Sequence, residues 1–389
     1  MQPSCRGHVN SEGVLSIIDP PYDALELIRA IHPHFRMKSE PPPDSYIPVL
    51  ERTKKLTNPD LRLDDLDRLE TSALWEIHDR LVKSGSTRQA GEVSLLDLKV
   101  ELASKALLNC RLCGCECGVN RFQTPGRCHL KDEGFYQSIY VHIAEEPPIT
   151  PCLVVKLYGC ALRCKGCQAF DVLPVPSGAK CLGPGVWREA RCTAGFDQAV
   201  ALEWVGGNPD ESLYPILYAL QFTRDLSLPI VWNNHGYGAQ EVYRLLEGVA
   251  DVYVMDFKFG KGNCCEEVAG ISDYWKFATA GLEEAMKQNA GIIIRILVMP
   301  GHVHCCHEPA LQWLSRYRHR LWISFLEFIP MWKAVSDPQL KRGVATSELV
   351  AVRVIAKDYG LRDIDETPGQ FWSIPSTSDL VVVPDGRGF

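Results

Sequence analysis

The chain has 389 residues, 46% of them hydrophobic, so it can bury a large core as a one- or two-domain globular protein. Its formal net charge of -7 and the lack of a long Lys- and Arg-rich stretch argue against general nucleic-acid binding. No run of eighteen apolar residues occurs and the N-terminus lacks the apolar core of a secretory signal, so we expect a cytoplasmic protein without a membrane partner. Thiols stay reduced in the cytoplasm, and the clustering of the sixteen cysteines therefore favours metal or cluster ligation over disulfides.

Residues 1–104 are expected to form a mainly helical N-terminal extension. They carry no clustered cysteines, and Pro41, Pro42 and Pro43 break the segment in two. In the second half, apolar residues recur every few positions, which predicts amphipathic helices packed on the main body. These apolar residues are Leu61, Leu63, Leu66, Leu69, Leu74, Ile77 and Leu81. The pattern favours a helical lid or a docking surface.

Residues 105–150 are expected to form a Cys-rich, metal-binding segment. Cys110, Cys113 and Cys117 are closely spaced, and Cys128 follows after ten intervening residues. Four thiolates at short spacing suit a closed tetrahedral zinc site or a second, auxiliary iron-sulfur cluster, with Cys115 as a spare. Zinc is the more conservative expectation, and a disulfide or free thiols remain open.

Residues 151–335 alternate short β-branched runs with longer stretches of helical spacing, which is the pattern of repeated βα units in an α/β fold. Strands are predicted at 153–157, 201–205, 229–233, 251–256, 291–298 and 321–328, and helices between them at 212–224, 239–247, 273–289 and 308–318. Six such units make a partial (β/α)6 barrel of TIM type, whose active face lies at the carboxyl ends of the strands. Residues 336–389, with a helix at 346–357 and a strand at 380–383, are expected to close its open side.

Three thiols, Cys160, Cys164 and Cys167, directly follow the first of these predicted strands on a tight loop. Three thiolates can hold three irons of a 4Fe-4S cube, whereas electron-transfer clusters of this kind use four. The fourth iron would then be open to a substrate or cofactor, so this loop is the candidate catalytic centre. The alternative is a chance trio of buried or zinc-binding thiols.

A glycine pair follows the second predicted strand. Gly206 and Gly207 lack side chains and let a ligand approach the backbone, and Asn208 adds a carbonyl acceptor. The sequence therefore predicts a ligand-binding loop here, with a purely structural turn as the alternative.

Polar residues end the next two predicted strands. Asn233 and Asn234, followed by His235, end the third and could orient a ligand. Asp256 and Lys258 end the fourth, where charged residues at the mouth of a barrel favour function over a surface ion pair. Arg295, inside the fifth strand, is costly to bury without an anion, and a cofactor carboxylate or a phosphate would serve.

Two cysteine doublets, Cys264-Cys265 and Cys305-Cys306, occur in loops past the fourth and fifth predicted strands. Adjacent thiols rarely both bind one metal. The nearby histidines allow a metal or cobalt ligand set, but a polar loop with incidental histidines is equally compatible with the pattern; they are His302, His304 and His307.

The Cys-x3-Cys-x2-Cys loop after a first strand resembles the signature of the radical S-adenosylmethionine (SAM) superfamily. The resemblance implies that the open iron binds the amino and carboxylate groups of SAM, and that reductive cleavage gives a 5'-deoxyadenosyl radical. Residues 206–209 stand where the superfamily has a Gly-Gly-Glu-Pro loop that grips the SAM amino group, but here Asn208 replaces the acid. At Gly166 the superfamily usually has an aromatic residue that packs on the adenine, so either another ring covers the adenine or the space is open.

Within that superfamily, residues 105–335 are similar to the homologues of pyruvate formate-lyase activating enzyme. The matching motifs lie at 110–121, 145–149, 160–167, 205–209, 232–238, 256–258 and 297–302. The resemblance implies the cluster and SAM and leaves the substrate open, because most members have no assigned function. Further departures, Ile296 where relatives commonly carry His and the tryptophans Trp322 and Trp332, suggest a specialised reaction.

Three functions remain open on this basis. The first is cobalamin-dependent C-methylation, similar to that of the radical SAM enzymes that methylate a glutamine carbon in methyl-coenzyme M reductase, although no Asp-x-His-x-x-Gly segment for a His-ligated cobalamin is present. The second is activation of a glycyl-radical enzyme, and the third is a non-enzymatic iron-sulfur or zinc scaffold. Both enzymatic functions imply a protein or peptide substrate and a one-electron reductant such as flavodoxin or ferredoxin.

Overall fold

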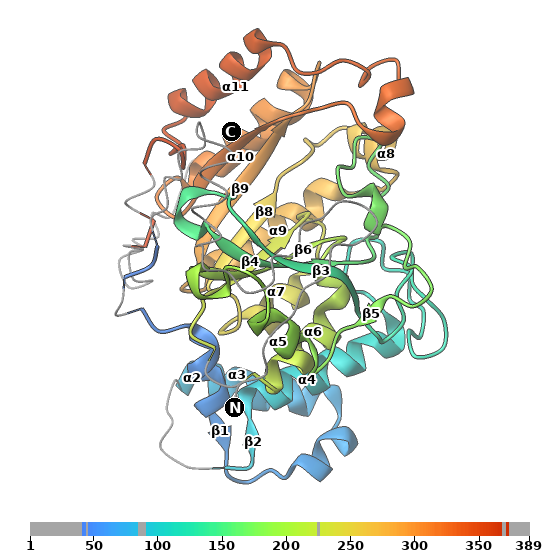
Figure 1. Cartoon of the computed structure of the whole chain (residues 1–389), viewed down its shortest axis with the longest axis vertical. Coiled ribbons are helices and arrows are strands. Elements are labelled where there is room, and N and C mark those ends of the chain that lie inside the picture. Colours follow the sequence, from blue (N-terminus) through green and yellow to red (C-terminus); the bar gives the residue numbers. More distant parts are fainter. Residues whose placement is uncertain (1–40, 44–45, 85–90, 224–225, 368–370, 373–389) are drawn as a thin grey trace, which may run out of the picture.

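The computed structural model describes residues 41–43, 46–84, 91–223, 226–367 and 371–372. These residues form an α/β fold built on one eight-stranded, mainly parallel sheet (Figure 1). The strand expected at 380–383 lies outside the described residues.

Six parallel strands pair in the order in which they occur in the chain. They are β4 (Cys152–Leu157), β6 (Ala201–Gly206), β7 (Ile230–Asn234), β8 (Val252–Asp256), β9 (Gly291–Val298) and β10 (Trp322–Glu327). All six predicted strands are therefore confirmed, each within one residue of its expected bounds. The described strands form an open sheet with β10 at one edge, and closure into a barrel is not seen.

Two antiparallel strands, β3 (Phe135–His142) and β5 (Lys180–Cys181), extend the sheet beyond β4. β3 belongs to residues 105–150, which we expected to be a separate Cys-rich unit. Because β3 pairs directly with β4, the expected boundary at 150 falls between two neighbouring strands of one sheet. The sequence did not predict β3, since most of its residues are only partly buried and show no clean alternation.

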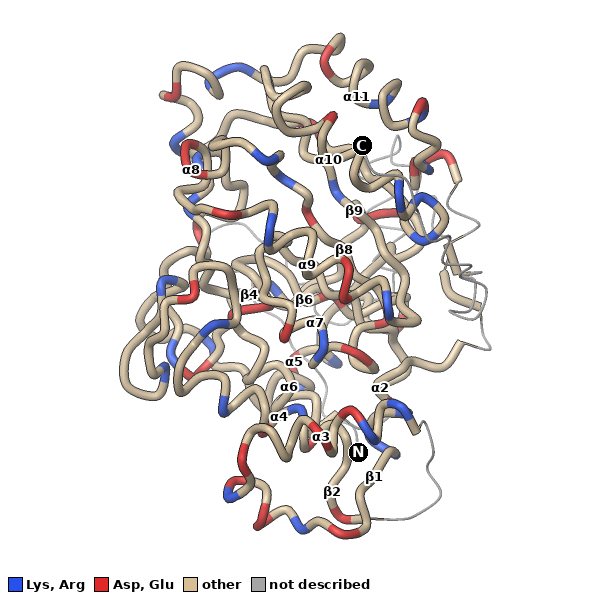
Figure 2. The backbone as a smooth tube through the Cα atoms, turned by 180° about the vertical axis from the view of Figure 1, so that it is seen from behind, with Lys and Arg blue, Asp and Glu red and all other residues tan. Residues whose placement is uncertain are grey.

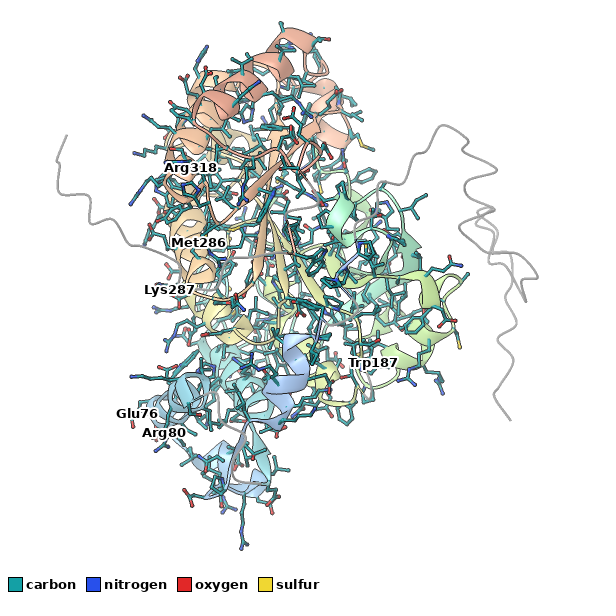
Figure 3. All side chains as sticks on the ribbon, turned by 90° about the vertical axis from the view of Figure 1, so that its left-hand side faces the viewer. Glu76, Arg80, Trp187, Met286, Lys287 and Arg318 are labelled. Atoms are coloured by element: carbon teal, nitrogen blue, oxygen red, sulfur yellow. The ribbon has the colours of Figure 1, made fainter. Side chains whose placement is uncertain are left out.

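The helices between the parallel strands are α5 (Val186–Arg191), α6 (Leu213–Gln221), α7 (Gln240–Leu246), α8 (Cys264–Ala269), α9 (Tyr274–Met286) and α10 (Glu308–Leu314). α6, α7, α9 and α10 match predicted helices, while α5 and α8 were not predicted. α11 (Thr346–Asp358) follows β10 as expected. Figure 3 shows Met286 and Lys287 at the end of α9 and Arg318 after α10 along one side of the molecule, with Trp187 of α5 on the other.

Single helical turns complete the secondary structure. The 3-10 turns are Leu63–Arg68, Leu107–Asn109, Pro147–Ile149, Phe170–Val172, Phe196–Gln198, Asp210–Ser212, Ser315–Tyr317 and Trp332–Ser336, and Val303–His307 forms a π-helical turn.

Both faces of the parallel sheet are covered, which explains why its strands read as apolar runs. The larger core cluster includes the helix side chains, and a smaller cluster on the opposite face of the strands includes Val154, Val231, Val254, Ile293 and Trp322. Two residues further along the strands, the same face becomes polar, because Asp256 aligns with Arg295 and Arg295 with Ser324. The face of the sheet that is opposite the helices, called the inner face below, is therefore apolar where the strands begin and polar where they end.

The N-terminal extension caps the ends at which the parallel strands begin. It consists of α2 (Val49–Lys55), β1 (Thr57–Asn58), α3 (Thr71–Ser84), β2 (Val93–Ser94) and α4 (Leu95–Ala106), which runs across the expected boundary at 104. Asp251, at the start of β8, accepts hydrogen bonds from the Tyr46 hydroxyl at 2.8 Å and the Val49 N–H at 3.0 Å. In Figure 1 these elements occupy the lower end of the molecule and α8 the upper end, so the extension does not form a lid over the active face.

The helices of the described chain include none that is both long and apolar enough to cross a membrane. On the side seen in Figure 2, Lys and Arg are scattered among Asp and Glu along the backbone.

Candidate functional site

The loop that carries Cys160, Cys164 and Cys167 is held from two sides. Gly159 turns the chain at the end of β4 with a positive φ of 85°. Further along, the Arg163 N–H donates to the Ala269 carbonyl at 2.9 Å and the Lys165 N–H to the Val268 carbonyl at 2.8 Å. The loop is therefore fixed to the carboxyl end of α8 and lies at the carboxyl ends of the parallel strands, as expected.

The three thiols of this loop are free. Cys160 is buried, and Cys164 and Cys167 are half-buried. Burial raises the pKa of all three thiols, and that of Cys164 rises to about 11. At Cys160 and Cys164, the other thiols of the loop raise the pKa further. Among the described residues, the ligand groups whose atoms all lie within 4.8 Å of one another do not include this trio. One tetrahedral zinc ion would need its sulfurs about 3.8 Å apart, so the three thiols as they stand are not arranged around a single zinc ion.

Gly206 and Gly207 bring a second loop into backbone contact with the Cys loop. A side chain at Gly207 would overlap the carbonyl group of Gly159, and one at Gly206 would lie 2.6 Å from the Leu157 nitrogen. Gly206 also has a φ of 114°, which only glycine adopts readily. We expected these glycines to make room for a ligand, and in the structure they make room for the chain itself.

Asn208 and a residue that the sequence did not single out, Glu211, connect this loop to the Cys loop. The Asn208 amide donates to Glu211, and its carbonyl oxygen accepts from the His235 N–H at 3.0 Å. Glu211 Oε1 in turn accepts from the Ala161 N–H at 3.0 Å and from His235 Nε2 at 3.1 Å. The Asn208 side chain thus serves the internal network, and the carboxylate beside the Cys loop comes from Glu211.

The pair formed by Glu211 and His235 is buried against Cys160. Atoms of Glu211, His235 and Cys160 all lie within 4.8 Å of one another. Burial alone would raise the pKa of Glu211, but His235 and the surrounding hydrogen-bond donors lower it overall, so the carboxylate is ionised at neutral pH. The Tyr237 N–H donates to His235 Nδ1 at 3.1 Å, which leaves the proton on Nε2, facing Glu211. The network places a negative charge close to the first thiol.

Asp256 ends β8 and Lys258 lies two residues further on, and both interact electrostatically with Cys164. Lys258 Nζ donates to Asp256 Oδ2 at 2.5 Å, and burial of Lys258 is outweighed by Asp256 and the thiols, which raise its pKa. The charge of Lys258 opposes the increase in pKa that burial causes at Cys164 and Cys167. Both charged residues therefore interact electrostatically with the Cys loop, through Cys164.

Asn233 and Asn234 point to opposite faces of the sheet, because neighbouring residues of a strand alternate. Asn233 faces inward and donates to Glu203 Oε1 at 2.7 Å. Asn234 faces the helices, where its carbonyl oxygen accepts from the Gly236 N–H at 2.8 Å and the Tyr243 hydroxyl at 3.2 Å. Of the two, only Asn233 shares a face with the polar residues of the sheet.

The anionic partners of Arg295 are carboxylates of the same chain. It donates to both carboxylate oxygens of Glu146 at 2.7 Å and also to Glu145. Glu203 lies in the same interior network, where burial and then Glu145 raise its pKa to about 8. We expected a bound carboxylate or phosphate beside Arg295, and the two glutamates remove the need for one.

The space beside Gly166 is filled by Phe328, which follows β10. A side chain at Gly166 would overlap the ring of Phe328, which is itself buried. Of the two alternatives for this position, an open space or a ring from elsewhere in the chain, the structure shows the ring.

The Cys-rich segment packs on the Cys loop, and the thiols of the segment lie in two separate groups. The Arg127 side chain donates to the Ala161 carbonyl at 2.9 Å. A side chain at Gly126 would lie 3.3 Å from Cys128 Sγ and 3.4 Å from Cys117 Sγ. Cys110 is close to the same pair, since it interacts electrostatically with both, whereas Cys113 hydrogen-bonds with Cys115. Cys110, Cys117 and Cys128 thus gather on one side, and the predicted fourth ligand, Cys113, faces Cys115.

Comparisons with known proteins add a distant relative. No family model matches the chain. The uncharacterized protein MJ0674 of Methanocaldococcus jannaschii is 29% identical over 320 residues, which make up 77% of this chain and 92% of that protein. The structure of HydG, a maturase of the FeFe hydrogenase, aligns with a TM-score of 0.38 and 14% identity over 76% of this chain and 63% of HydG. The chain thus spans less than two thirds of HydG, and a likeness at this TM-score carries no argument about function.

Proposed function

We propose that the chain is a radical SAM enzyme whose 4Fe-4S cluster is held by Cys160, Cys164 and Cys167. The observation that carries this proposal is the set of three free thiols on one fixed loop at the carboxyl end of β4, which are not gathered around a single point as zinc ligands would be. When bound, the cluster supplies the electron that breaks a carbon–sulfur bond of SAM, giving methionine and a 5'-deoxyadenosyl radical that removes hydrogen from a carbon of the substrate. The mainly parallel sheet, with six strands in chain order, supports this proposal, since the superfamily is expected to have a parallel α/β fold.

The residues around the loop fit a negatively charged cluster. Lys258 places a positive charge beside Cys164 and Cys167, where it offsets the charge of their thiolates. Glu211 fixes the loop through its hydrogen bond with the Ala161 N–H, and α8 fixes it from the other side. The loop is thus pre-organised by contacts that do not involve the thiols themselves.

For SAM we propose contacts from the backbone of Gly206 and Gly207 and from Asp256, with Asn233 and Arg295 lining the inner face below them. Asn208, which replaces the acid of the superfamily loop, acts through Glu211, since its side chain is engaged there. Phe328 is proposed to provide the aromatic surface that the superfamily usually has at the position of Gly166. Asn234 belongs to the helix side of β7 and is left out of the site.

The proposed substrate is a protein or peptide, and two reactions are carried forward for it. One is C-methylation of a glutamine in methyl-coenzyme M reductase with cobalamin as methyl donor, and the other is activation of a glycyl-radical enzyme. The Phe328 ring beside Gly166 weakens the first, because a corrin bound there would need open space. The relation to the activating-enzyme homologues rests on the sequence motifs alone.

The proposal is tested with the full chain, reconstituted anaerobically with iron and sulfide and mixed with SAM and dithionite. We expect 5'-deoxyadenosine from the parent and none from Cys164→Ala. Cys181→Ala is the matched control, because Cys181 is an exposed thiol on β5, and it should turn over like the parent. Product from Cys164→Ala would show that the assignment of the cluster ligands is wrong. No product from a parent that contains the cluster would rule the enzyme out and favour the iron-sulfur scaffold.

The two reactions differ in a second product. With cobalamin present, methyl transfer gives S-adenosylhomocysteine together with 5'-deoxyadenosine, whereas an activase gives 5'-deoxyadenosine alone. Replacing dithionite by flavodoxin or ferredoxin tests the proposed one-electron partner in the same assay.

A further inference from the structure

Two loops on the active face bring a second group of potential metal ligands together. Cys264 begins α8, after β8, and His302, Cys305 and Cys306 follow β9, the last two within the π-helical turn. Each of the four residues offers one ligand atom, and these atoms all lie within 4.8 Å of one another. The group shares no residue with the Cys160 loop.

The distances within this group match those of a single tetrahedral ion. Cys264 Sγ lies 3.7 Å from Cys305 Sγ, and Cys305 Sγ lies 3.8 Å from Cys306 Sγ. His302 Nδ1 lies 3.3 Å from Cys305 Sγ and 3.8 Å from Cys306 Sγ. With zinc–sulfur and zinc–nitrogen bonds of about 2.3 and 2.0–2.1 Å, tetrahedral geometry places sulfurs about 3.8 Å apart and a sulfur and a nitrogen about 3.5 Å apart.

Other uses of these thiols fit the structure less well. A 4Fe-4S cube is larger than one ion and needs its thiolates further apart than the 3.7 and 3.8 Å seen here. A disulfide would join only two of the three sulfurs and leave His302 Nδ1 facing the third without a role. The set of three cysteines and one histidine is a known closed set for structural zinc.

The other histidines and the cysteine near this group have different partners, so they are not counted among the metal ligands. His304 is exposed and pairs with Glu308 at 2.7 Å, and His307 Nε2 accepts from the Met299 N–H at 3.0 Å. Cys265 contacts the Gly262 carbonyl. The sequence argument that adjacent thiols rarely share a metal did not anticipate that the π-helical turn would aim Cys305 and Cys306 at the same point.

We propose that Cys264, His302, Cys305 and Cys306 bind one zinc ion, which joins the loop after β8 to the loop after β9. The backbone already brings the two loops together, because a side chain at Gly260 would overlap the carbonyl of Cys305. The carboxyl end of α8 holds the Cys160 loop through Ala269 and Val268, so the ion anchors the helix against which that loop is fixed. The site is structural, since four protein ligands leave no open position.

The test measures zinc in the full chain purified anaerobically, in a Cys117→Ser, Cys128→Ser background that removes two thiols of the Cys-rich segment. We expect about one zinc per chain, lost in His302→Ala and in Cys305→Ser and retained in His304→Ala, the exposed control from the same loop. Zinc-edge absorption should show three sulfur ligands and one nitrogen. Cys164→Ala should lower the iron content and leave the zinc in place, which separates this site from the proposed cluster.

Two results would overturn the proposal. One is equal zinc in His302→Ala, Cys305→Ser and the background protein. The other is a Cys264–Cys305 disulfide in the anaerobically purified chain, found by peptide mapping. Because Cys305 is exposed, its replacement by serine should leave the fold intact, and circular dichroism checks this.

Discussion

Glu211 and His235 form a buried hydrogen-bonded pair, with Oε1 3.1 Å from Nε2, directly beside the thiol of Cys160. The same carboxylate accepts from the Ala161 N–H, one residue past that thiol. A single side chain therefore links the loop after β6, the end of β7 and the proposed cluster loop.

Glu211→Gln is expected to loosen the Cys loop. A carboxylate only accepts hydrogen bonds, whereas the new amide has an NH2 group on one side. At least one of the three groups that donate to Glu211 therefore loses its acceptor, which lowers the free energy of unfolding by about 1.5–3 kcal/mol. The urea midpoint should fall, and the iron content after reconstitution should fall as well. Glu76→Gln, on the exposed face of α3 (Figure 3), is the control. Unchanged iron and stability in Glu211→Gln would show that this carboxylate does not hold the loop.

Gly207→Ala should prevent the loops after β4 and β6 from packing. The new methyl group would overlap backbone atoms of Gly159, which cannot move as a flexible side chain would, so we expect a cost at the upper end of about 1–3 kcal/mol or above. Thermal unfolding and iron content measure it. Gly262→Ala is matched, because a side chain there meets nothing within 4 Å. Equal effects of the two variants would contradict the close contact.

Gly166 and Phe328 should be energetically coupled. Gly166→Ala alone is expected to cost about 1–3 kcal/mol through overlap with the ring, and less in a Phe328→Leu background where the ring is gone. A double-mutant cycle on urea unfolding gives the coupling. If Phe328 also covers the adenine, Phe328→Leu raises the KM for SAM and Phe328→Tyr restores it. Additive effects of the two changes would argue against the contact.

Lys258→Met is expected to lower the reduction potential of the cluster. Reduction adds negative charge beside Cys164 and Cys167, and the lysine charge favours the reduced state. Each 1.4 kcal/mol of lost interaction corresponds to about 59 mV in a one-electron step. A redox titration followed by electron paramagnetic resonance measures the shift. Lys261→Met, at an exposed position three residues on, is the control, and an equal shift there would contradict a local effect.

Lys99 should make stability depend on pH. Its Nζ lies 2.8 Å from His78 Nε2 inside the extension, and burial lowers its pKa from 10.5 to about 7. Between these values the unfolded chain binds the proton and the folded chain does not, so stability rises with pH across that interval, by up to about 5 kcal/mol. The urea midpoint of the parent, relative to Lys99→Met, should therefore increase from pH 7 to 10. Lys83→Met controls for the loss of one lysine, and a difference that is flat or falls with pH would refute the buried neutral lysine.

The sequence predicted the parallel strands well because each is a short β-branched run that is buried on both faces. β9, for example, has the predicted bounds, and three consecutive isoleucines are fully buried in it. β3, most of whose residues are only partly buried, lacks such a run and was missed. The helix ends were predicted less well, since tertiary contacts determine where a helix stops.

For the site, local spacing identified the Cys160 loop but not the groups that surround it. Glu211 and Phe328 lie next to that loop only because parallel strands bring distant loops to one edge of the sheet. The partners of Arg295 lie about 150 residues earlier in the chain. Cys264 and Cys305 are 41 residues apart, so no short motif marks them as neighbours.

The strand order also has a consequence for biosynthesis. Synthesis proceeds from the N-terminus, so the Cys160 loop leaves the ribosome before Glu211, His235 and Lys258, which later enclose it. Until β8 has joined the sheet, the thiols of the Cys160 loop are open to oxidants and to other metal ions. The enclosed setting proposed for the cluster is therefore complete only in the nearly finished polypeptide.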